Sequence, residues 1–134
     1  MLNLDSQNLK FSIIIPAYDE ADAIENVLKE LRTHLSEKKY QAEIIVVDDG
    51  SQDQTNKILK VFKDIKLISH PYNKGYGASL KTGVKNSKYD WLLWYDSDGQ
   101  HQPEYIEELI KYCNEYDMII GARVGYQGPF FRQP

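Results

Sequence analysis

Cysteine is nearly absent from this chain of 134 residues, which contains Cys113 and no second cysteine. An intrachain disulfide is therefore impossible, and a metal site built from cysteine thiolates is excluded. No apolar stretch approaches the roughly 18 to 20 residues that a membrane-spanning helix requires. Residues 1–10 are polar and lack the apolar centre of a secretory signal. These absences favour a cytoplasmic protein.

An excess of positive charge is also lacking, because the formal net charge is −4 at pH 7. This balance argues against a general nucleic-acid-binding protein. The charge is uneven, however, since residues 57–88 contain eight lysines and a single acid, Asp64. Lysines at helical spacing usually form solvated helix faces, but this segment could also approach anionic lipid headgroups. With 42% hydrophobic residues, the chain can bury the core of one soluble domain.

Neither of the two common glycine-rich phosphate-binding loops is present. Gly75 and Gly77 begin the dinucleotide-binding pattern, but Leu80 stands where its third glycine belongs. The Gly-Lys-Ser/Thr loop of nucleoside triphosphatases is missing as well. Redox chemistry with a dinucleotide cofactor is therefore not expected.

Apolar runs with the spacing of strands alternate with stretches that have the spacing of helices. The expected strands are residues 11–15, 43–47, 66–69, 91–95 and 118–120. The expected helices are residues 21–36 and 78–86 and the stretches around Leu59 and Leu109. This alternation predicts an α/β fold in which helices cover both faces of a mostly parallel sheet. The carboxyl ends of such strands share one edge, where ligands bind.

Two aspartates directly follow the expected strand 91–95, within the segment DSDGQ. Because neighbouring carboxylates repel each other, Asp96 and Asp98 together favour a divalent cation. Mg²⁺ or Mn²⁺ would suit them, since these ions take carboxylate oxygens together with substrate phosphates and water. Gln100 could add a carbonyl oxygen. The alternative is a turn in which the aspartates accept hydrogen bonds from the backbone.

Two other classes of protein carry a similar acidic segment. A calcium-binding EF-hand loop would require glycine where His101 stands and a helix before the loop. A phosphatase with an aspartate nucleophile also begins with Asp-x-Asp-Gly after a strand, and it is the main catalytic alternative. Such phosphatases usually carry threonine at the position of Gln100 and use the first strand. Here the segment follows the fourth expected strand.

Acidic and aromatic residues also follow the first two expected strands. Asp48 could accept a hydrogen bond from uracil or guanine, and either Asp48 or Asp49 could instead stabilise the start of the next helix. Tyr18 could stack on a base or simply pack at the end of its strand. Glu20 could bind ribose hydroxyls or lie in the first turn of a helix, where acids are favoured. The sequence leaves both interpretations open.

The segments IIIPAYDEADAI, EIIVVDDGSQDQT, NKGYGASLKTG and YDSDGQHQPEYI together resemble the family 2 glycosyltransferases. The resemblance is strongest to the branch of polyprenyl-phosphate (dolichyl-phosphate) mannose or glucose synthases, and it runs from residue 11 to about residue 123. It implies a GT-A fold, a UDP- or GDP-sugar donor and inversion at the anomeric carbon. It also implies a lipid-phosphate acceptor, reached by a cytoplasmic protein at the inner face of a membrane.

The resemblance assigns roles to individual residues of this chain. The nucleotide-sugar site would comprise Pro16, Tyr18, Glu20, Asp48, Asp49, Lys74, Gly75, Asp96, Ser97 and Asp98. Within it, Asp48 would contact the base, and Lys74 and Gly75 would border the nucleotide. The metal ligands would be Asp96, Asp98 and Gln100. The catalytic residues would be Asp96, Asp98 and Arg123, of which the arginine approaches the phosphates.

Three segments are expected: a polar tail (1–10), a nucleotide-sugar-binding domain (11–123) and the incomplete start of an acceptor-side region (124–134). A lipid phosphate is already an anion and needs no carboxylate base, and residues 119–134 contain no acid. Family members continue for many residues beyond this length. We therefore expect a C-terminally truncated GT-A domain with weak or absent transfer, or a non-catalytic nucleotide-binding fragment. Apolar surface exposed by truncation would favour a homo-oligomer.

Overall fold

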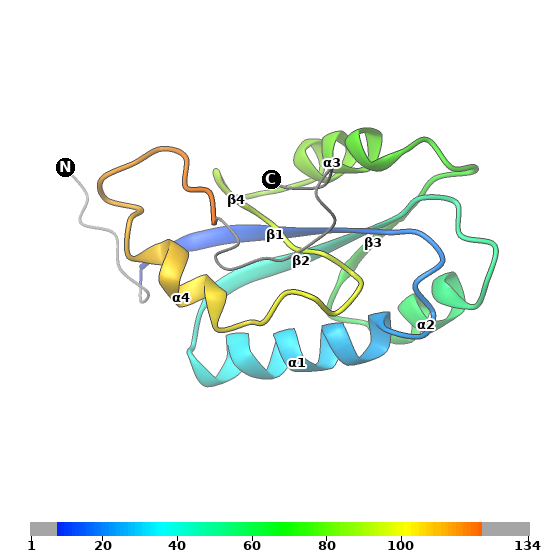
Figure 1. Cartoon of the computed structure of the whole chain (residues 1–134), viewed down its shortest axis with the longest axis horizontal. Helices are drawn as coiled ribbons and strands as arrows, with labels where there is room; N and C mark the ends of the chain where they lie inside the picture. Colours follow the sequence, from blue (N-terminus) through cyan, green and yellow to red (C-terminus); the bar gives the residue numbers. More distant parts are fainter. Residues whose placement is uncertain (1–7, 122–134) are drawn as a thin grey trace, which may run out of the picture.

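The computed structural model describes residues 8–121 and shows a parallel four-stranded sheet between layers of helices (Figure 1). The strands are β1 (Lys10–Ala17), β2 (Gln41–Asp48), β3 (Lys66–Ser69) and β4 (Trp91–Trp94). The helices are α1 (Ile24–Glu37), α2 (Thr55–Val61), α3 (Tyr76–Lys85) and α4 (Tyr105–Ile110). The strand order is β3-β2-β1-β4, and every pairing is parallel. The predicted α/β architecture is confirmed.

The strand order determines which face each helix covers. From β1 through β2 to β3 the chain advances in one direction across the sheet, so right-handed crossovers place α1 and α2 on the same face. The chain then returns past β2 and β1 to β4. This reversed crossover places α3 on the opposite face, above the sheet in Figure 1. Helices therefore cover both faces, as the sequence predicts.

Alternate residues of β1 and β2 enter the two layers of the core. On the face of α1 and α2 the buried side chains include Ile13, Ile15, Ile44, Val46, Ile24, Leu28, Leu31 and Leu59. The apolar stripe of α1 is thus buried as its spacing predicts. On the face of α3, Ile14 pairs with Ile45, and both are fully buried. The sheet is apolar on both sides, which explains the nearly continuous apolar strands.

β1 is longer than its sequence indicates. An end before Pro16 is expected from the sequence, but the strand continues through it to Ala17. Tyr95 N–H donates to Ile14 O, so the backbone of residues 14 and 16 faces β4. β4 pairs with β1 only as far as Ile14. The nitrogen of Pro16 therefore has no strand beside it. Because proline lacks an N–H, a position where no hydrogen bond between strands is made is the one that tolerates it.

The predicted strand at residues 118–120 is absent from the structure. This segment joins none of the four strands, and Met118 and Ile120 are 76% and 77% exposed. A short apolar run becomes a strand only where a neighbouring strand takes its backbone hydrogen bonds. No neighbouring strand pairs with residues 118–120, so the prediction of a strand from their apolar composition is wrong.

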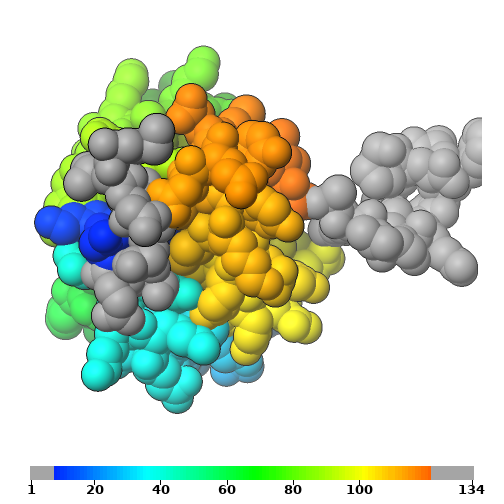
Figure 2. Space-filling model, turned by 90° about the vertical axis from the view of Figure 1, so that its left-hand side faces the viewer, coloured from blue at the N-terminus to red at the C-terminus, as the bar shows by residue number. Residues whose placement is uncertain are grey.

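α4 packs against the C-terminal half of α1 through a buried polar contact. Figure 2 shows the segment that contains α4 lying beside the end of α1. His34 Nε2 of α1 lies 2.6 Å from Glu107 Oε1 of α4, and Tyr40 Oη donates to the same oxygen at 3.1 Å. Burial and the hydrogen bond with Glu107 raise the pKa of Tyr40 to about 12. This contact fixes α4, which follows the acidic segment after β4.

The lysine-rich segment does not form one continuous helix face. Lys57 and Lys60 lie on α2, whereas Lys81 and Lys85 lie on α3, across the sheet from α2. All four are exposed, as expected of solvated helix faces. Among the helices of residues 8–121, none combines the length and the apolar character needed to cross a bilayer.

Close packing of α3 on the sheet depends on Gly83. This glycine lies against Ile14 of β1, and a Cβ placed on it would come within 2.4 Å of Ile14 Cγ2. No side chain fits there unless Ile14 or the helix moves. Gly77, in the first turn of the same helix, has no such neighbour, because its Cβ would meet no atom within 4 Å.

Gly83→Ala is expected to lower the free energy of unfolding by about 1 to 3 kcal/mol, since overpacking a filled core forces side chains or backbone to shift. Urea unfolding followed by circular dichroism measures the change. The matched control is Gly77→Ala, which should be neutral or slightly stabilising because alanine favours a helix. Equal stability of the two variants would contradict the close approach of α3 to Ile14.

Candidate functional site

The loops after β1, β2 and β3 border one cleft at the carboxyl edge of the sheet, as parallel topology predicts. The cleft has a volume of about 510 Å³. The loop after β1 contributes Tyr18, which is 42% exposed. The remaining walls come from β2 and its loop, from α2, and from the end of β3 and its loop, and they include Asp48, Ser51, Gln52, Asn56, Lys60, Ser69, His70 and Tyr72.

Asp48 ends β2 and faces this cleft, although only 2% of the residue is exposed. Its Oδ1 accepts a hydrogen bond from Ser51 N–H at 3.0 Å. Its Oδ2 accepts one from Asn56 Nδ2 at 2.7 Å, and the same amide group donates to Ser69 Oγ at 2.9 Å. Each carboxylate oxygen keeps a second lone pair, so Asp48 can also accept from a ligand. The aspartate thus shapes the loop and lines the cleft.

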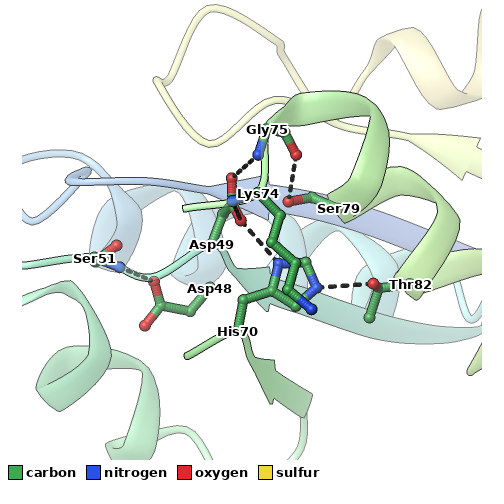
Figure 3. A network of polar contacts seen from close by, with 8 residues as sticks. All are labelled: Asp48, Asp49, Ser51, His70, Lys74, Gly75, Ser79 and Thr82. Atoms are coloured by element: carbon green, nitrogen blue, oxygen red, sulfur yellow. Dashed lines mark hydrogen bonds and ion pairs between the residues drawn. The ribbon is translucent and has the colours of Figure 1, made fainter. Parts of the chain in front are cut away.

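Asp49 points to the other face of the sheet, toward α3 (Figure 3). Its Oδ1 lies 2.8 Å from His70 Nδ1 and accepts from Lys74 N–H at 2.8 Å. Its Oδ2 accepts from Gly75 N–H at 2.9 Å. His70 Nε2 lies 2.8 Å from Thr82 Oγ1 on α3. An ionised carboxylate only accepts hydrogen bonds, so His70 Nδ1 is the donor to Asp49, and the contact of Nε2 with Thr82 ties the ring to α3.

Asp49 therefore anchors the loop after β3 to both β2 and α3. Burial opposes ionisation of its carboxyl, but hydrogen bonds from His70, Lys74 and Gly75 outweigh burial and hold the pKa below its ordinary value. The group is ionised at neutral pH. Both of its carboxylate oxygens hold hydrogen bonds with protein donors. Asp49 does not line the cleft, and its role in the structure is to hold the loop after β3 in place. His70, which the sequence analysis does not single out, completes this arrangement.

Glu20 lies in an acidic environment that joins the loops after β1 and β4. Burial raises the pKa of its carboxyl, and the nearby charges of Asp98, Asp53 and Asp22 raise it further. Asp98 is exposed, and its Oδ1 accepts from Gln100 N–H at 3.0 Å. Asp98 thus makes the backbone hydrogen bond of the alternative turn, and its carboxylate remains at the surface.

Asp96 lies deeper than Asp98, between α3 and the segment before α4. Its backbone N–H donates to His101 Nδ1 at 3.0 Å, and its Oδ2 lies 3.5 Å from His101 Nε2. Burial raises the pKa of Tyr76, in the first turn of α3, and the charge of Asp96 raises it further. The charge of Asp96 is therefore felt by Tyr76 of α3, and that of Asp98 by Glu20 in the loop after β1.

Within residues 8–121, no group of three or more acidic, histidine or cysteine side chains is arranged to hold a metal ion. Asp96 and Asp98 do not form a complete site on their own. Mg²⁺ and Mn²⁺ in nucleotide-binding proteins commonly take one or two carboxylates and fill their remaining positions with phosphate oxygens and water. The acidic surroundings of Glu20 and Asp98 would favour such a cation. These side chains fit a metal that is bound together with a nucleotide.

The other residues predicted for the nucleotide-sugar site differ in how deeply they are buried. Pro16 is buried within β1, and Ser97 is 7% exposed. Lys74 is exposed, with its Nζ 5.4 Å from the centre of the Tyr72 ring. Gly75 has φ of +102°, which glycine adopts freely. Arg123 lies outside the described residues.

The model of the family Glycosyl transferase family 2 matches residues 12–134, nearly the whole chain. This chain belongs to glycosyl transferase family 2. The assignment excludes the aspartate-nucleophile phosphatase that the acidic segment alone left open. It agrees with the resemblance carried by the four sequence segments.

One relative of this chain is the UDP-N-acetylglucosamine–dolichyl-phosphate N-acetylglucosaminyltransferase of Methanococcus voltae. The two are 32% identical over 145 residues, which cover 91% of this chain and 55% of the relative. The chain thus spans about half the length of the curated relatives it matches. This relative supports placement within the polyprenyl-phosphate sugar transferase branch.

Solved structures identify the fold of this family member as GT-A. S. aureus TarS 1–349 in complex with UDP-GlcNAc superimposes with a TM-score of 0.63 at 27% identity, over 80% of this chain and 32% of that chain. Glucosyl-3-phosphoglycerate synthase from Mycobacterium tuberculosis, solved with Mn²⁺ and UDP, gives a TM-score of 0.67 at 22% identity. That match covers 82% of this chain and 41% of the synthase, and it supports the fold alone.

Proposed function

We propose that this glycosyltransferase binds the nucleoside of a UDP-sugar in the cleft beside Asp48. The observation that carries the proposal is the position of Asp48, whose carboxylate lines the cleft together with Tyr18. The imide N–H of uracil requires one acceptor, which a remaining lone pair of Asp48 can supply. Guanine presents two adjacent donors and would need the remaining lone pairs of both oxygens at the same time, whereas uracil needs only one of them. The Methanococcus relative and TarS are both named with UDP-GlcNAc, which supports the choice of uracil.

The diphosphate would extend from this cleft toward Asp96 and Asp98, which would hold Mg²⁺ or Mn²⁺ against it. Manganese is the ion named with UDP in the structure of the M. tuberculosis synthase. When bound, the ion would act as a Lewis acid that stabilises negative charge on the departing UDP. The role of the chain itself is to present the two carboxylates. Arg123 would add a second positive charge near the phosphates.

The reaction that we infer is inverting transfer to a polyprenyl phosphate, an acceptor class named in the Methanococcus relative. An oxygen of the acceptor phosphate forms a bond to the anomeric carbon from the face opposite UDP. The bond between that carbon and the β-phosphate oxygen breaks, and UDP leaves with the electron pair. The acceptor phosphate is already ionised near pH 7, so the step needs no proton-abstracting side chain. Such an acceptor would bring the protein to a membrane surface.

Isothermal titration calorimetry with UDP and GDP, each in the presence of Mn²⁺, tests the proposed donor. We expect UDP to bind at least about tenfold more tightly than GDP, which corresponds to roughly 1.4 kcal/mol. Asp48→Asn should reduce UDP affinity, because an amide oxygen is a weaker acceptor than a carboxylate. The control Asp64→Asn removes an exposed charge after α2 and should leave affinity unchanged. Equal binding of GDP and UDP would contradict the assignment of uracil.

A further inference from the structure

A set of reciprocal hydrogen bonds, here called the loop clamp, joins the loop after β1 to the loop after β2. On one side, Asp19 Oδ1 accepts from the backbone N–H of Gln52 at 2.8 Å and of Asp53 at 3.3 Å. Both donors belong to the stretch that leads into α2. A single carboxylate oxygen therefore holds two successive amides of a segment more than thirty residues away in sequence.

The second loop returns hydrogen bonds to the first. Three successive N–H groups beyond the end of β1, those of residues 19, 20 and 21, are each taken by a side chain. The acceptors are Ser51 Oγ at 2.9 Å, Thr55 Oγ1 at 2.9 Å and Asp53 Oδ2 at 3.3 Å. Residues 19–21 lie beyond the end of β1, so these side chains, rather than a neighbouring strand, accept their backbone hydrogen bonds. The two loops consequently form one hydrogen-bonded unit.

Asp19 occupies a backbone conformation that few residues adopt. Its φ is +50°, in the left-handed region, where aspartate, asparagine and glycine are the best tolerated residues. The turn at Asp19 lies between Tyr18 and Glu20, two residues that the sequence assigns to the nucleotide site. Aspartate thus meets two requirements of this position: it tolerates the left-handed backbone conformation, and its side chain supplies the oxygen that accepts the two hydrogen bonds.

The loop clamp supports two walls of the cleft. Tyr18 borders the cleft from the first loop, and Ser51 and Gln52 border it from the second. Ser51 belongs to both arrangements, since its Oγ accepts from Asp19 N–H and its own N–H donates to Asp48. Asp19 itself does not line the cleft. Its effect on a ligand would therefore pass through the positions of Tyr18, Ser51 and Gln52.

We propose that Asp19 is a positioning residue for the nucleotide: it fixes the spacing between Tyr18 and Asp48 before the ligand arrives. The proposal rests on the proposed function, in which this cleft holds the nucleoside. A loop that is ordered in the free protein loses less conformational entropy on binding, and this preorganisation raises affinity. A clamp that serves stability alone would leave affinity unchanged.

Two substitutions at position 19 separate the hydrogen bonds from the backbone conformation and the charge. Asp19→Gly tolerates the positive φ but removes the acceptor, so we expect UDP to bind about tenfold or more weakly in the presence of Mn²⁺. Asp19→Asn retains an acceptor oxygen and tolerance of the turn while removing the charge. It should therefore bind UDP within about threefold of the unaltered chain. The control Asp64→Asn removes an exposed charge that pairs with Arg32, outside the loop clamp, and should change affinity little.

Titrations are performed at a temperature where circular dichroism shows every variant to be folded. Weaker UDP binding by Asp19→Gly, with near-normal binding by Asp19→Asn and Asp64→Asn, is the result expected. Unaltered UDP affinity in Asp19→Gly, even with a lower melting temperature, would overturn the positioning role and leave the proposed function intact. Equal losses in Asp19→Gly and Asp19→Asn would also overturn it, since charge would then be the cause. Absence of UDP binding by the unaltered chain would instead refute the proposed function, and the positioning role with it.

Discussion

Asp49→Ala is expected to lower the free energy of unfolding by about 3 to 5 kcal/mol, because it removes a buried carboxylate that accepts hydrogen bonds from three protein donors. The substitution would leave His70 Nδ1 and the N–H groups of Lys74 and Gly75 without their acceptor. Urea unfolding followed by circular dichroism measures the loss. Asp64→Ala, which breaks an exposed pair with Arg32, is the control and should cost less than about 1 kcal/mol.

The same network predicts how stability depends on pH. The pKa of the Asp49 carboxyl is lower in the folded protein than its ordinary value of 3.8. Its contribution is therefore fully present above the unfolded pKa and is lost as pH falls through the folded pKa. The stability difference between the unaltered chain and Asp49→Ala should narrow only below about pH 4. A difference that is small at pH 7 would show that the anchored loop contributes little to the fold.

The double substitution Asp96→Asn, Asp98→Asn is expected to abolish the effect of Mn²⁺ on UDP binding. In the unaltered chain, Mn²⁺ should strengthen UDP binding by about a hundredfold, roughly 2.7 kcal/mol, because the cation neutralises both carboxylates and the diphosphate. Neutral amides bind the ion weakly and remove that coupling. Calorimetry with UDP, with and without Mn²⁺, measures the difference between the two proteins.

Asp90→Asn is the matched control for that experiment. Asp90 is an exposed acid immediately before β4, at the edge of the sheet opposite Asp96 and Asp98. Its substitution changes the net charge without altering the proposed metal ligands, so the Mn²⁺ effect should persist. A Mn²⁺ effect that survives the double substitution would mean that other groups bind the ion.

Most of the fold could be predicted from the sequence, because β1, β2 and β4 are nearly continuous apolar runs and α1 carries a regular apolar stripe. The failures have local physical reasons. Residues 118–120 have a strand-like composition but no neighbour that takes their backbone bonds. β1 passes through Pro16 because β4 ends before it. Both outcomes depend on strand partners, which a single sequence does not specify.

The site could be predicted in its location but only partly in its contacts. Parallel topology brings the loops of Tyr18 and Asp48 to one edge, as expected. The different directions of Asp48 and Asp49 follow from the alternation of β2 once the positions of α2 and α3 are known. Those positions depend on the strand order. The partnership of Asp49 with His70 is a contact between distant residues that no local pattern indicates.

Anomalous diffraction from crystals grown with UDP and Mn²⁺ tests the central claim most directly. The account predicts uracil beside Asp48 and one manganese peak about 2.0 to 2.3 Å from carboxylate oxygens of Asp96 and Asp98 and from a diphosphate oxygen. Ordered UDP whose manganese lies away from both aspartates, or UDP bound outside the cleft of Asp48, would contradict it.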